Sequence, residues 1–341
     1  MISFLCFSFN KDSHEKSCYA MSSSCVFTAE NFGNPDLYTL IMNIISIVAT
    51  PVHFFGGFCI LFKTPSKMKS VKWIMFQLHT FSTLLDTCLS GVIIPFLYLP
   101  VLAGHPFGLL DSPVIEVYMS LTIFGVVGIS ILTVFENRYF VLFGQNTVWC
   151  KIRRPLLAVN YILVPTFLIP VFLELPEQES AFEYISELLP CKPELVIRNR
   201  KIYVLAVDYT TILITGGFMT VFVISEILLL AGVILRKTIR GDNVLTTKSK
   251  KTADTFTPFI LLAVPLSLLL SSIYFNYYNQ SLNNFVICIA SLHGFISTIA
   301  MILVHKPYRT FLFQLILKFL GIEKKVSPSN TRLYTLRARS N

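Results

Sequence analysis

The chain has 341 residues, of which 54% are hydrophobic and only 14% are charged. Soluble domains carry about 25% charged residues, so this composition excludes an ordinary soluble domain and indicates an integral membrane protein. The formal net charge is +9, but the basic residues lie between apolar segments and accompany no nucleic-acid-binding motif, which excludes nucleic acid as the expected partner.

Seven apolar segments are long enough to cross a bilayer as helices, which takes about 20 residues. In chain order they are Leu37–Phe62, Trp73–Leu102, Val114–Phe135, Leu156–Leu173, Ile202–Leu235, Phe256–Tyr277 and Phe285–Val304. Several contain proline, which membrane helices tolerate because neighbouring helices satisfy the freed carbonyls. The sequence therefore predicts an all-α integral membrane protein, with an amino-terminal segment (1–36) followed by a seven-transmembrane helix bundle (37–304).

The segment after the last span, residues 305–322, is too short to cross a bilayer. Thr310, Gln314 and Lys318 recur every fourth residue and give a polar stripe on an otherwise apolar helix. Such a helix lies in the plane of the membrane interface. The remaining residues, 323–341, are basic and polar, and we expect them to form a disordered tail.

The distribution of basic residues predicts the orientation in the membrane. Most of the 28 lysines and arginines follow the first, third and fifth spans or lie after the seventh. Cytoplasmic segments carry this excess, so we expect the amino terminus outside and the carboxyl terminus in the cytoplasm of a multi-pass plasma-membrane protein. The sequon at Asn279 falls in the sixth loop, on the predicted outer side, and makes Asn279 a glycosylation candidate.

Four ionisable residues inside the spans are candidates for a polar site in the membrane core. His79 and Asp86 are seven residues apart and share one face of the second span, and His53 and His293 can approach that face from the first and seventh spans. A charged Asp in the bilayer costs several kcal/mol unless it is paired. We consider a structural network joining spans one, two and seven, a functional switch or sodium-like site, and a metal site. The spacing matches no metal motif, so neither a metal nor a cofactor is predicted.

Two pairs of residues near the predicted outer ends of the spans are ligand-pocket candidates. Glu116 and Tyr118 lie near the outer end of the third span, and Asp208 and Tyr209 near that of the fifth. They either line a pocket of the kind that holds small ligands between helices or sit at the interface, where Tyr is common.

The string FENRYF ends the third span with Glu136, Asn137, Arg138 and Tyr139. Snorkelling of an arginine to the interface accounts for Arg138 alone, but not for the acid two residues earlier. Residues i and i+2 of a helix do not face each other, so we expect Glu136 and Arg138 to pair with different neighbouring helices. A charge that is held in one packing and released in another is a plausible latch.

The chain resembles the nematode serpentine receptor class H chemoreceptors, which are seven-transmembrane G-protein-coupled receptors. The matching strings are KTPSKMKSVKW (63–73), HTFSTLLD (79–86), AGHPFG (103–108), FENR (135–138), LPCKPEL (189–195) and HGFISTIAMILVHKPYR (293–309). The resemblance implies a receptor in the sensory cilia of chemosensory neurons that binds a small extracellular molecule and acts through the Gα subunit of a heterotrimeric G protein. It also implies a role in G-protein coupling for the FENRYF residues and for Lys306, Pro307, Tyr308 and Arg309.

The chain departs from the rhodopsin-like pattern in two respects. Asn137 separates the acid from the arginine, and no cysteine opens the third span to link it to the second outer loop. Cys191 in that loop and Cys25 or Cys18 in the amino-terminal segment share the predicted oxidising side. A Cys25–Cys191 disulfide is the hypothesis that we favour.

Other classes of membrane protein fit less well. An opsin needs a retinal-linking lysine in the seventh span, and Phe285–Val304 contains none. An odour-gated channel of the insect kind has its amino terminus inside, contrary to the charge bias. A secondary transporter that uses Asp86 and the histidines as a proton path, or another ligand-gated channel, is the alternative. No residue cluster predicts an enzyme, and the sequence gives neither the ligand nor the oligomeric state.

Overall fold

The computed structural model describes residues 32–110, 112–189, 193–239 and 253–321. The predictions that concern the first 31 residues, the tail and the cysteines Cys18, Cys25 and Cys191 lie outside this part of the chain.

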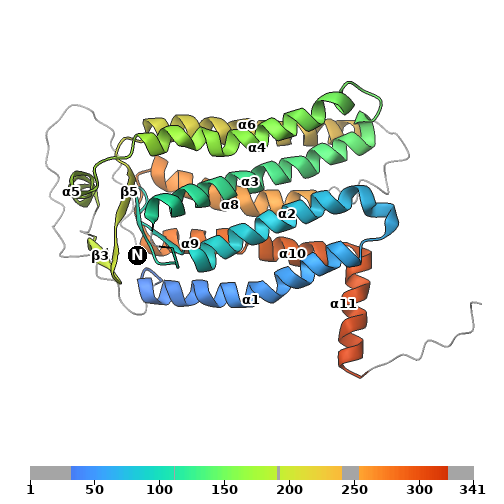
Figure 1. Ribbon diagram of the computed structural model, residues 1–341, viewed down its shortest axis with the longest axis horizontal. Coiled ribbons are helices and arrows are strands. Elements are labelled where there is room, and N and C mark those ends of the chain that lie inside the picture. The colour runs from blue at the N-terminus through green and yellow to red at the C-terminus, as the bar shows by residue number, and fades with distance from the viewer. Residues whose placement is uncertain (1–31, 111, 190–192, 240–252, 322–341) are drawn as a thin grey trace, which may run out of the picture.

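Long helices that run alongside one another form the body of the protein (Figure 1). They are α1 (Pro35–Phe62), α2 (Lys69–Thr87), α3 (Pro113–Tyr139), α4 (Trp149–Leu173), α6 (Thr210–Ile239), α8 (Ala253–Tyr274) and the consecutive pair α9 (Gln280–Ser291) and α10 (His293–Val304). The predicted membrane-spanning helix bundle is confirmed, and the described strands are short elements at one end of it.

Length and hydropathy distinguish the spans from one another. Within the described residues, α1, α3, α4 and α6 each qualify as membrane spans, and α9 with α10 makes a fifth. The apolar part of α8, Pro258–Tyr274, is shorter. α2 is interrupted by His79, Asp86 and several hydroxyl groups, but it packs against α1, α3 and α10, which cover its polar side. α2 and α8 complete the seven crossings that the sequence predicts.

The predicted end of the second span is wrong. The span was expected to continue to Leu102, but the chain leaves the helical path after one π-helical turn, Cys88–Val92. Ile94 has a positive φ of 46°, and Pro95 has no backbone N–H to donate, so helical hydrogen bonding cannot continue. The apolar residues that follow form strands.

The predicted start of the fifth span is also wrong. The span was expected from Ile202, but Tyr203–Ala206 is a strand and the helix begins at Thr210. Asp208 accepts hydrogen bonds from the Thr210 amide (2.9 Å) and hydroxyl (2.7 Å), as an N-cap residue does. The seventh span, expected as one helix, is bent by 41° between α9 and α10.

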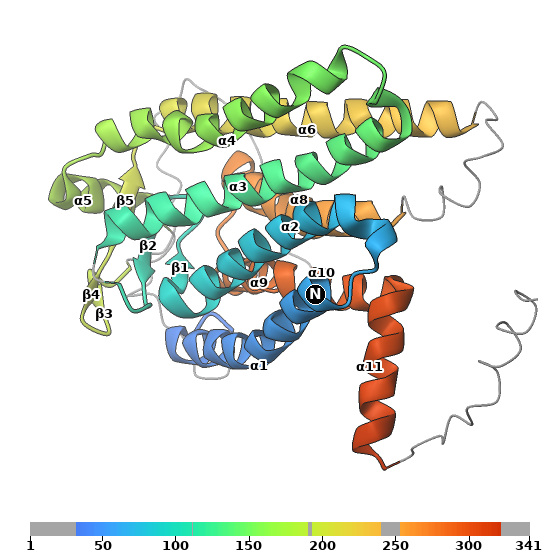
Figure 2. The ribbon, with the colours of Figure 1, turned by 45° about the vertical axis from the view of Figure 1, so that its right-hand side comes forward.

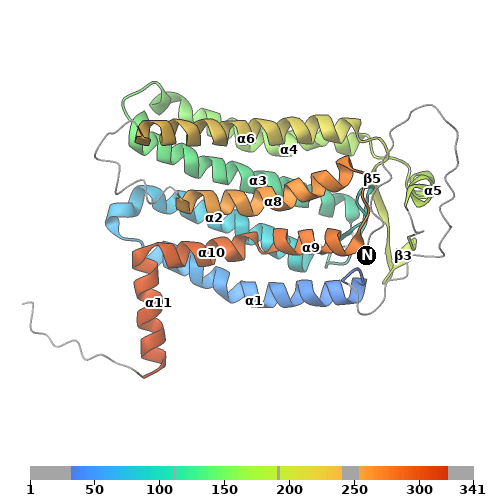
Figure 3. The same ribbon diagram turned by 180° about the vertical axis from the view of Figure 1, so that it is seen from behind.

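Short strands and helix α5 (Gln178–Leu188) lie across one end of the bundle, which we call the sheet end (Figures 1 and 3). β1 (Pro95–Leu97), β2 (Leu102–Pro106) and β5 (Tyr203–Ala206) form an antiparallel sheet in the order β1-β2-β5, and β3 (Val196–Ile197) pairs with β4 (Arg200–Lys201). The Gln178 side chain bonds both backbone groups of Val204, at 2.9 and 3.1 Å, and so ties α5 to β5.

Helix α11 (Lys306–Phe319) leaves the opposite end, which we call the α11 end, and turns sharply away from the bundle (Figures 1 and 2). It is anchored to α1 by Tyr308, which is fully buried and whose hydroxyl lies 2.7 Å from Thr64 Oγ1. Most of the other α11 side chains are exposed, including Phe313, Leu315 and Phe319. An apolar helix with this placement suits a membrane interface.

The sheet end has its own apolar core. Phe96 and Tyr98 are fully buried there and pack with residues of α1, α5, α9 and β5. His105 on β2 is 1% exposed, and its ring lies 5.6 Å from that of Tyr98 and 5.9 Å from that of Phe107. Burial lowers the pKa of His105 from 6.5 to about 4, although backbone groups of Leu195 and Glu194 act in the opposite direction.

The buried His105 should make the sheet end sensitive to acid. A histidine whose folded-state pKa is lowered stabilises the fold above pH 6.5, and this contribution is lost as the pH falls from 6.5 toward 4, because the unfolded state binds the proton more tightly. The full shift corresponds to on the order of 3 kcal/mol. We expect the melting temperature of the purified protein to fall between pH 7 and pH 5, and to fall less in His105→Phe. Equal losses in the two proteins would contradict this origin.

Candidate functional site

The bend in the seventh span leaves backbone groups without partners inside the membrane. Leu292 is the junction between α9 and α10, and its amide donates to the Ile289 carbonyl. The regular hydrogen bonding of α10 starts only at Ile296, whose amide donates to the Leu292 carbonyl. The amides of Gly294 and Phe295 therefore lack an acceptor in their own helix. An unsatisfied backbone group in hydrocarbon costs several kcal/mol, so an external acceptor is required.

Asp86 of α2 supplies that acceptor. Its Oδ1 accepts from the Gly294 amide at 2.9 Å, and its Oδ2 accepts from the Phe295 amide at 2.7 Å. The carboxylate thus caps the amino terminus of α10 from a neighbouring helix, where the helix dipole also favours negative charge. Asp86 is 1% exposed, and the two bonds connect the second and seventh spans.

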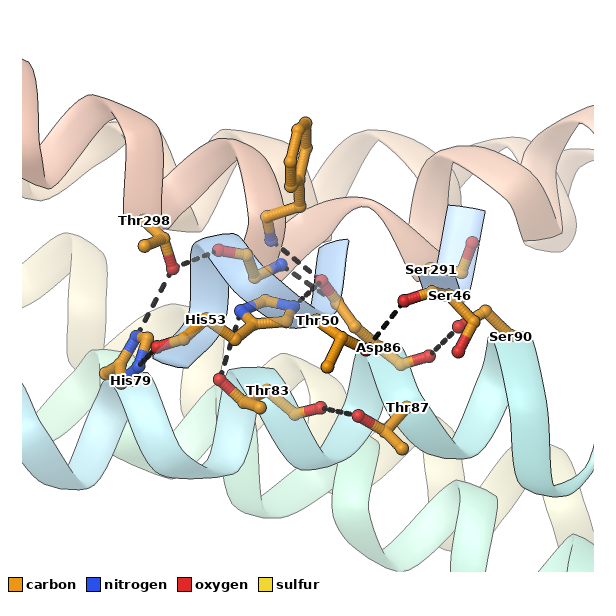
Figure 4. Close-up of polar contacts among 12 residues, drawn as sticks. Ser46, Thr50, His53, His79, Thr83, Asp86, Thr87, Ser90, Ser291 and Thr298 are labelled. Carbon is orange, nitrogen blue, oxygen red and sulfur yellow. Dashed lines mark hydrogen bonds and ion pairs between the residues drawn. The ribbon is translucent and has the colours of Figure 1, made fainter. Parts of the chain in front are cut away.

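His53 brings α1 into the same cluster (Figure 4). Its Nε2 lies 3.3 Å from Asp86 Oδ2, and its Nδ1 lies 3.2 Å from the Thr83 hydroxyl. The Thr83 hydroxyl is the hydrogen-bond partner of Nδ1, and Nε2 lies within ion-pair distance of the carboxylate. Spans one, two and seven therefore meet at one carboxylate.

A second histidine extends the network toward the α11 end. His79 Nε2 lies 3.0 Å from the His53 carbonyl, and its Nδ1 lies 3.2 Å from the Thr298 hydroxyl on α10 (Figure 4). Nearby hydroxyls bond to carbonyls of their own helices, for example Ser90 to Asp86 at 2.7 Å. Such back-bonding satisfies polar groups without opening the bundle.

A glycine permits the close approach of α10 to α2. A Cβ on Gly294 would lie 2.7 Å from the Ser82 carbonyl oxygen and 2.9 Å from Asp86 Oδ2. Both distances are shorter than carbon–oxygen contacts allow, so any other residue would push α10 away and lengthen the Asp86 bonds.

The structure brings together three of the four residues predicted for the membrane core. His53, His79 and Asp86 lie in one network. His293 is fully buried, and neither of its ring nitrogens has a hydrogen-bond partner among the residues that the structure describes. Sequence reasoning missed Thr83 and Thr298. Thr83 lies four residues after His79 and three before Asp86, so it is on the same face of the helix. The spacing that pointed to His79 and Asp86 could therefore have pointed to Thr83 as well.

The FENRYF residues form a separate cluster at the α11 end. Glu136 is 2% exposed, and its two carboxylate oxygens accept from Trp149 Nε1 at 2.7 Å and from an Arg153 guanidinium nitrogen at 2.8 Å. The same Arg153 nitrogen lies 3.4 Å from Asn137 Oδ1, and its guanidinium stacks 3.8 Å from the centre of the Phe140 ring. These contacts connect α3 with the start of α4.

The other residues predicted for G-protein coupling lie at the same end. Arg138 and Tyr139 are half-buried, and the Tyr139 ring packs against Trp149. Lys306 and Arg309 are exposed at the start of α11, where Arg309 donates to the Leu303 carbonyl at 3.0 Å. Pro307 takes up an early helical position of α11, which suits a residue that lacks an N–H, next to the buried Tyr308.

A further polar link ties α4 to α6. Asn160 Nδ2 donates to Glu226 Oε2 at 3.2 Å. A cavity of about 70 Å³ lies between this pair and the Glu136 cluster and is lined by residues of α3, α4 and α6. Helix α4 thus makes two polar connections, one to α3 and one to α6.

None of the four ligand-pocket candidates lines the cavity of about 70 Å³ between α3, α4 and α6. The Tyr118 hydroxyl donates to the Pro165 carbonyl of α4 at 3.2 Å, and Glu116 is fully buried in the first turn of α3. Asp208 is exposed and caps α6, and Tyr209 is half-buried near a backbone group of Leu102. The sheet end covers this region.

Two other features bear on ligands and modifications. Asn279, the glycosylation candidate, accepts from the Leu282 amide at 3.0 Å and caps α9. Within the described ranges, no three His, Cys, Asp or Glu side chains lie close enough together to hold a metal ion.

Comparison with known proteins identifies a family. The family described as "Serpentine type 7TM GPCR chemoreceptor Srh" matches residues 33–318. The chain is also similar to Serpentine receptor class H-72 of Caenorhabditis elegans, with 26% identity over 292 residues that cover 81% of this chain and 84% of that protein. The resemblance inferred from the sequence strings is confirmed, and the matched region includes the Asp86 network and the Glu136 cluster.

Replacement of Gly294 tests the close packing of α2 and α10. In Gly294→Ala, the added carbon must displace the Ser82 backbone, and we expect a loss of about 1–3 kcal/mol in stability. Gly232→Ala is the matched control, because nothing lies within 4 Å of a Cβ at that helical position. Thermal unfolding of the two purified variants gives the comparison, and equal melting temperatures would contradict the packing.

Proposed function

The chain belongs to the Srh family of serpentine seven-transmembrane chemoreceptors, and from this premise we propose that it binds a small extracellular molecule and activates a heterotrimeric G protein. The observation that carries the proposal is the family match over residues 33–318, which spans the whole helix bundle. We place the protein in the plasma membrane of chemosensory neurons, in their sensory cilia.

The charge distribution supports an orientation for this receptor. Basic side chains gather at the α11 end, and the acid-rich α5 region lies at the sheet end. We propose that the sheet end is extracellular and that the α11 end faces the cytoplasm, as the positive-inside rule requires. The Glu136 cluster then lies where a Gα subunit would dock.

We propose that the cluster acts as a latch. The Glu136–Arg153 pair holds α3 to α4, and the Asn160–Glu226 bond holds α6 to α4. A ligand that binds a second packing of the bundle more tightly would shift the population toward it. Breaking these links would let α6 move relative to α3 and open a groove for a helix of Gα.

A secondary transporter is the alternative that one observation favours. Transporters often use broken membrane helices, whose exposed ends bind substrate, and α9–α10 is such a break. Here, however, Asp86 of the same chain already occupies the exposed amides. We therefore favour the receptor. G-protein activation in cells exposed to a panel of small volatile organics, compared with uptake of the same compounds into vesicles, separates the two functions.

Arg138→Ala should abolish the response of receptor-expressing cells to any active compound, while surface expression persists. The reason is that the guanidinium at the end of α3 would contact Gα. Lys151→Ala is the control, since Lys151 is an exposed basic residue at the same end. Calcium imaging measures the response, and a full response from Arg138→Ala would defeat the assigned role.

Arg153→Gln should raise signalling in the absence of any added compound. The charge-assisted bond to Glu136 contributes about 1.5–3 kcal/mol, so its loss would raise the active population by roughly tenfold or more. Arg154→Gln, at the exposed neighbouring position, is the control. Basal G-protein activation that is unchanged in Arg153→Gln at equal surface expression would contradict the latch.

A further inference from the structure

An apolar cavity of about 280 Å³ lies between α1, α10 and α11, away from both polar clusters. Its lining includes Pro51, Val52, Phe55, Ile299, Leu303 and Leu312. Water would find almost no polar partner in this lining.

The course of the helices explains the cavity. Pro51 lacks an N–H and so removes one hydrogen bond of α1 beside the cavity. At the far side, α11 turns away from α10 (Figures 1 and 3), and Phe55 of α1 stacks on Phe311 of α11 with ring centres 6.1 Å apart. Leu303 is 48% exposed, so the cavity is a groove that opens on the outside of the bundle, where lipid lies.

Basic groups without acidic neighbours flank the groove. The Lys63 ammonium lies 4.3 Å from the centre of the Phe311 ring, at the junction of α1 and α11. The Arg309 guanidinium bonds to the carbonyl of Leu303, a lining residue, at 3.0 Å. Residues 37–85 and 255–322 contain no Asp or Glu. The charge at this rim is therefore positive and is not neutralised by the helices that form the groove.

We propose that the groove holds an acyl chain of an anionic phospholipid from the leaflet at the α11 end, with the lipid phosphate within reach of Lys63 and Arg309. The apolar lining fits the chain, and lysine and arginine at a membrane surface attract anionic headgroups. The groove reaches the interfacial helix α11, whose Leu312 lines it, so it lies at the depth of the membrane interface. The lipid would bridge α1, α10 and α11. The proposal does not depend on the receptor function, since any protein with this fold would present the same groove to lipid.

The test uses the full chain in nanodiscs that contain phosphatidylserine or phosphatidylcholine with a photoactivatable diazirine in the acyl chain. We expect labelling of the segments 51–55 and 299–303, and stronger labelling by phosphatidylserine, by roughly fivefold for each basic residue engaged. Labelling spread evenly over all lipid-facing helices, or equal labelling by the two lipids, would overturn the proposal.

Two variants separate the headgroup from the chain. Lys63→Gln should reduce labelling by phosphatidylserine roughly fivefold and leave labelling by phosphatidylcholine unchanged, whereas Lys318→Gln, near the far end of α11, should change neither. Leu303→Trp should fill the groove and reduce labelling by both lipids, whereas Ile296→Trp, on an exposed part of α10 outside the groove, should not.

The control for folding is the melting temperature of each variant, and Lys63→Gln keeps the test decisive if Leu303→Trp is unstable.

A second copy of the chain is the other occupant that an apolar groove can take. Val52→Cys and Leu303→Cys test this occupant. Crosslinks between two chains in the same nanodiscs, together with an absence of lipid labelling in the groove, would overturn the proposal.

Discussion

The carboxylate of Asp86 is the constraint on which the rest of the bundle depends. The seventh span bends inside the membrane and exposes two backbone amides, and hydrocarbon provides no water to satisfy them. Asp86 accepts hydrogen bonds from both amides and also lies against His53. These contacts reduce both the free-energy cost of burying the carboxylate and the cost of the two exposed amides at the bend. The arrangement determines which faces of α1, α2 and α10 meet, and Gly294 is required because no larger residue fits between them.

The two ends of the molecule have different physical characters. The sheet end has an apolar core of its own, built from strands, α5 and aromatic residues, and resembles a small soluble unit placed on the helices. Toward the α11 end, polar links such as Glu136 with Arg153 add to the apolar packing of α3 with α6, and a small cavity lies between α3, α4 and α6. Such polar links can be exchanged when the packing of the helices changes, which suits the end that we propose moves during signalling.

Hydropathy and charge were sufficient to predict the helix bundle, because membrane helices need long apolar runs. Spacing alone placed His79 and Asp86 on one face of the second span. The two backbone amides that Asp86 binds were beyond sequence reasoning, since they are exposed by a bend at Leu292, where no proline marks a break. Strands β1 and β5 were read as parts of helices because apolar runs of this length do not distinguish the two states. The pairing of Glu136 with Arg153 was also beyond sequence reasoning, because the approach of these residues depends on the loop between α3 and α4.

Hydrogen–deuterium exchange of the segment 292–298 in Asp86→Asn and in the wild-type protein tests the central claim most directly. An asparagine can accept one of the two bonds but directs an NH₂ group at the other amide. The loss of a buried partner costs about 1–3 kcal/mol, so exchange in this segment should accelerate by roughly 5- to 150-fold, while the centre of α3 stays protected. Equal exchange of the segment in both proteins would show that Asp86 does not hold the seventh span.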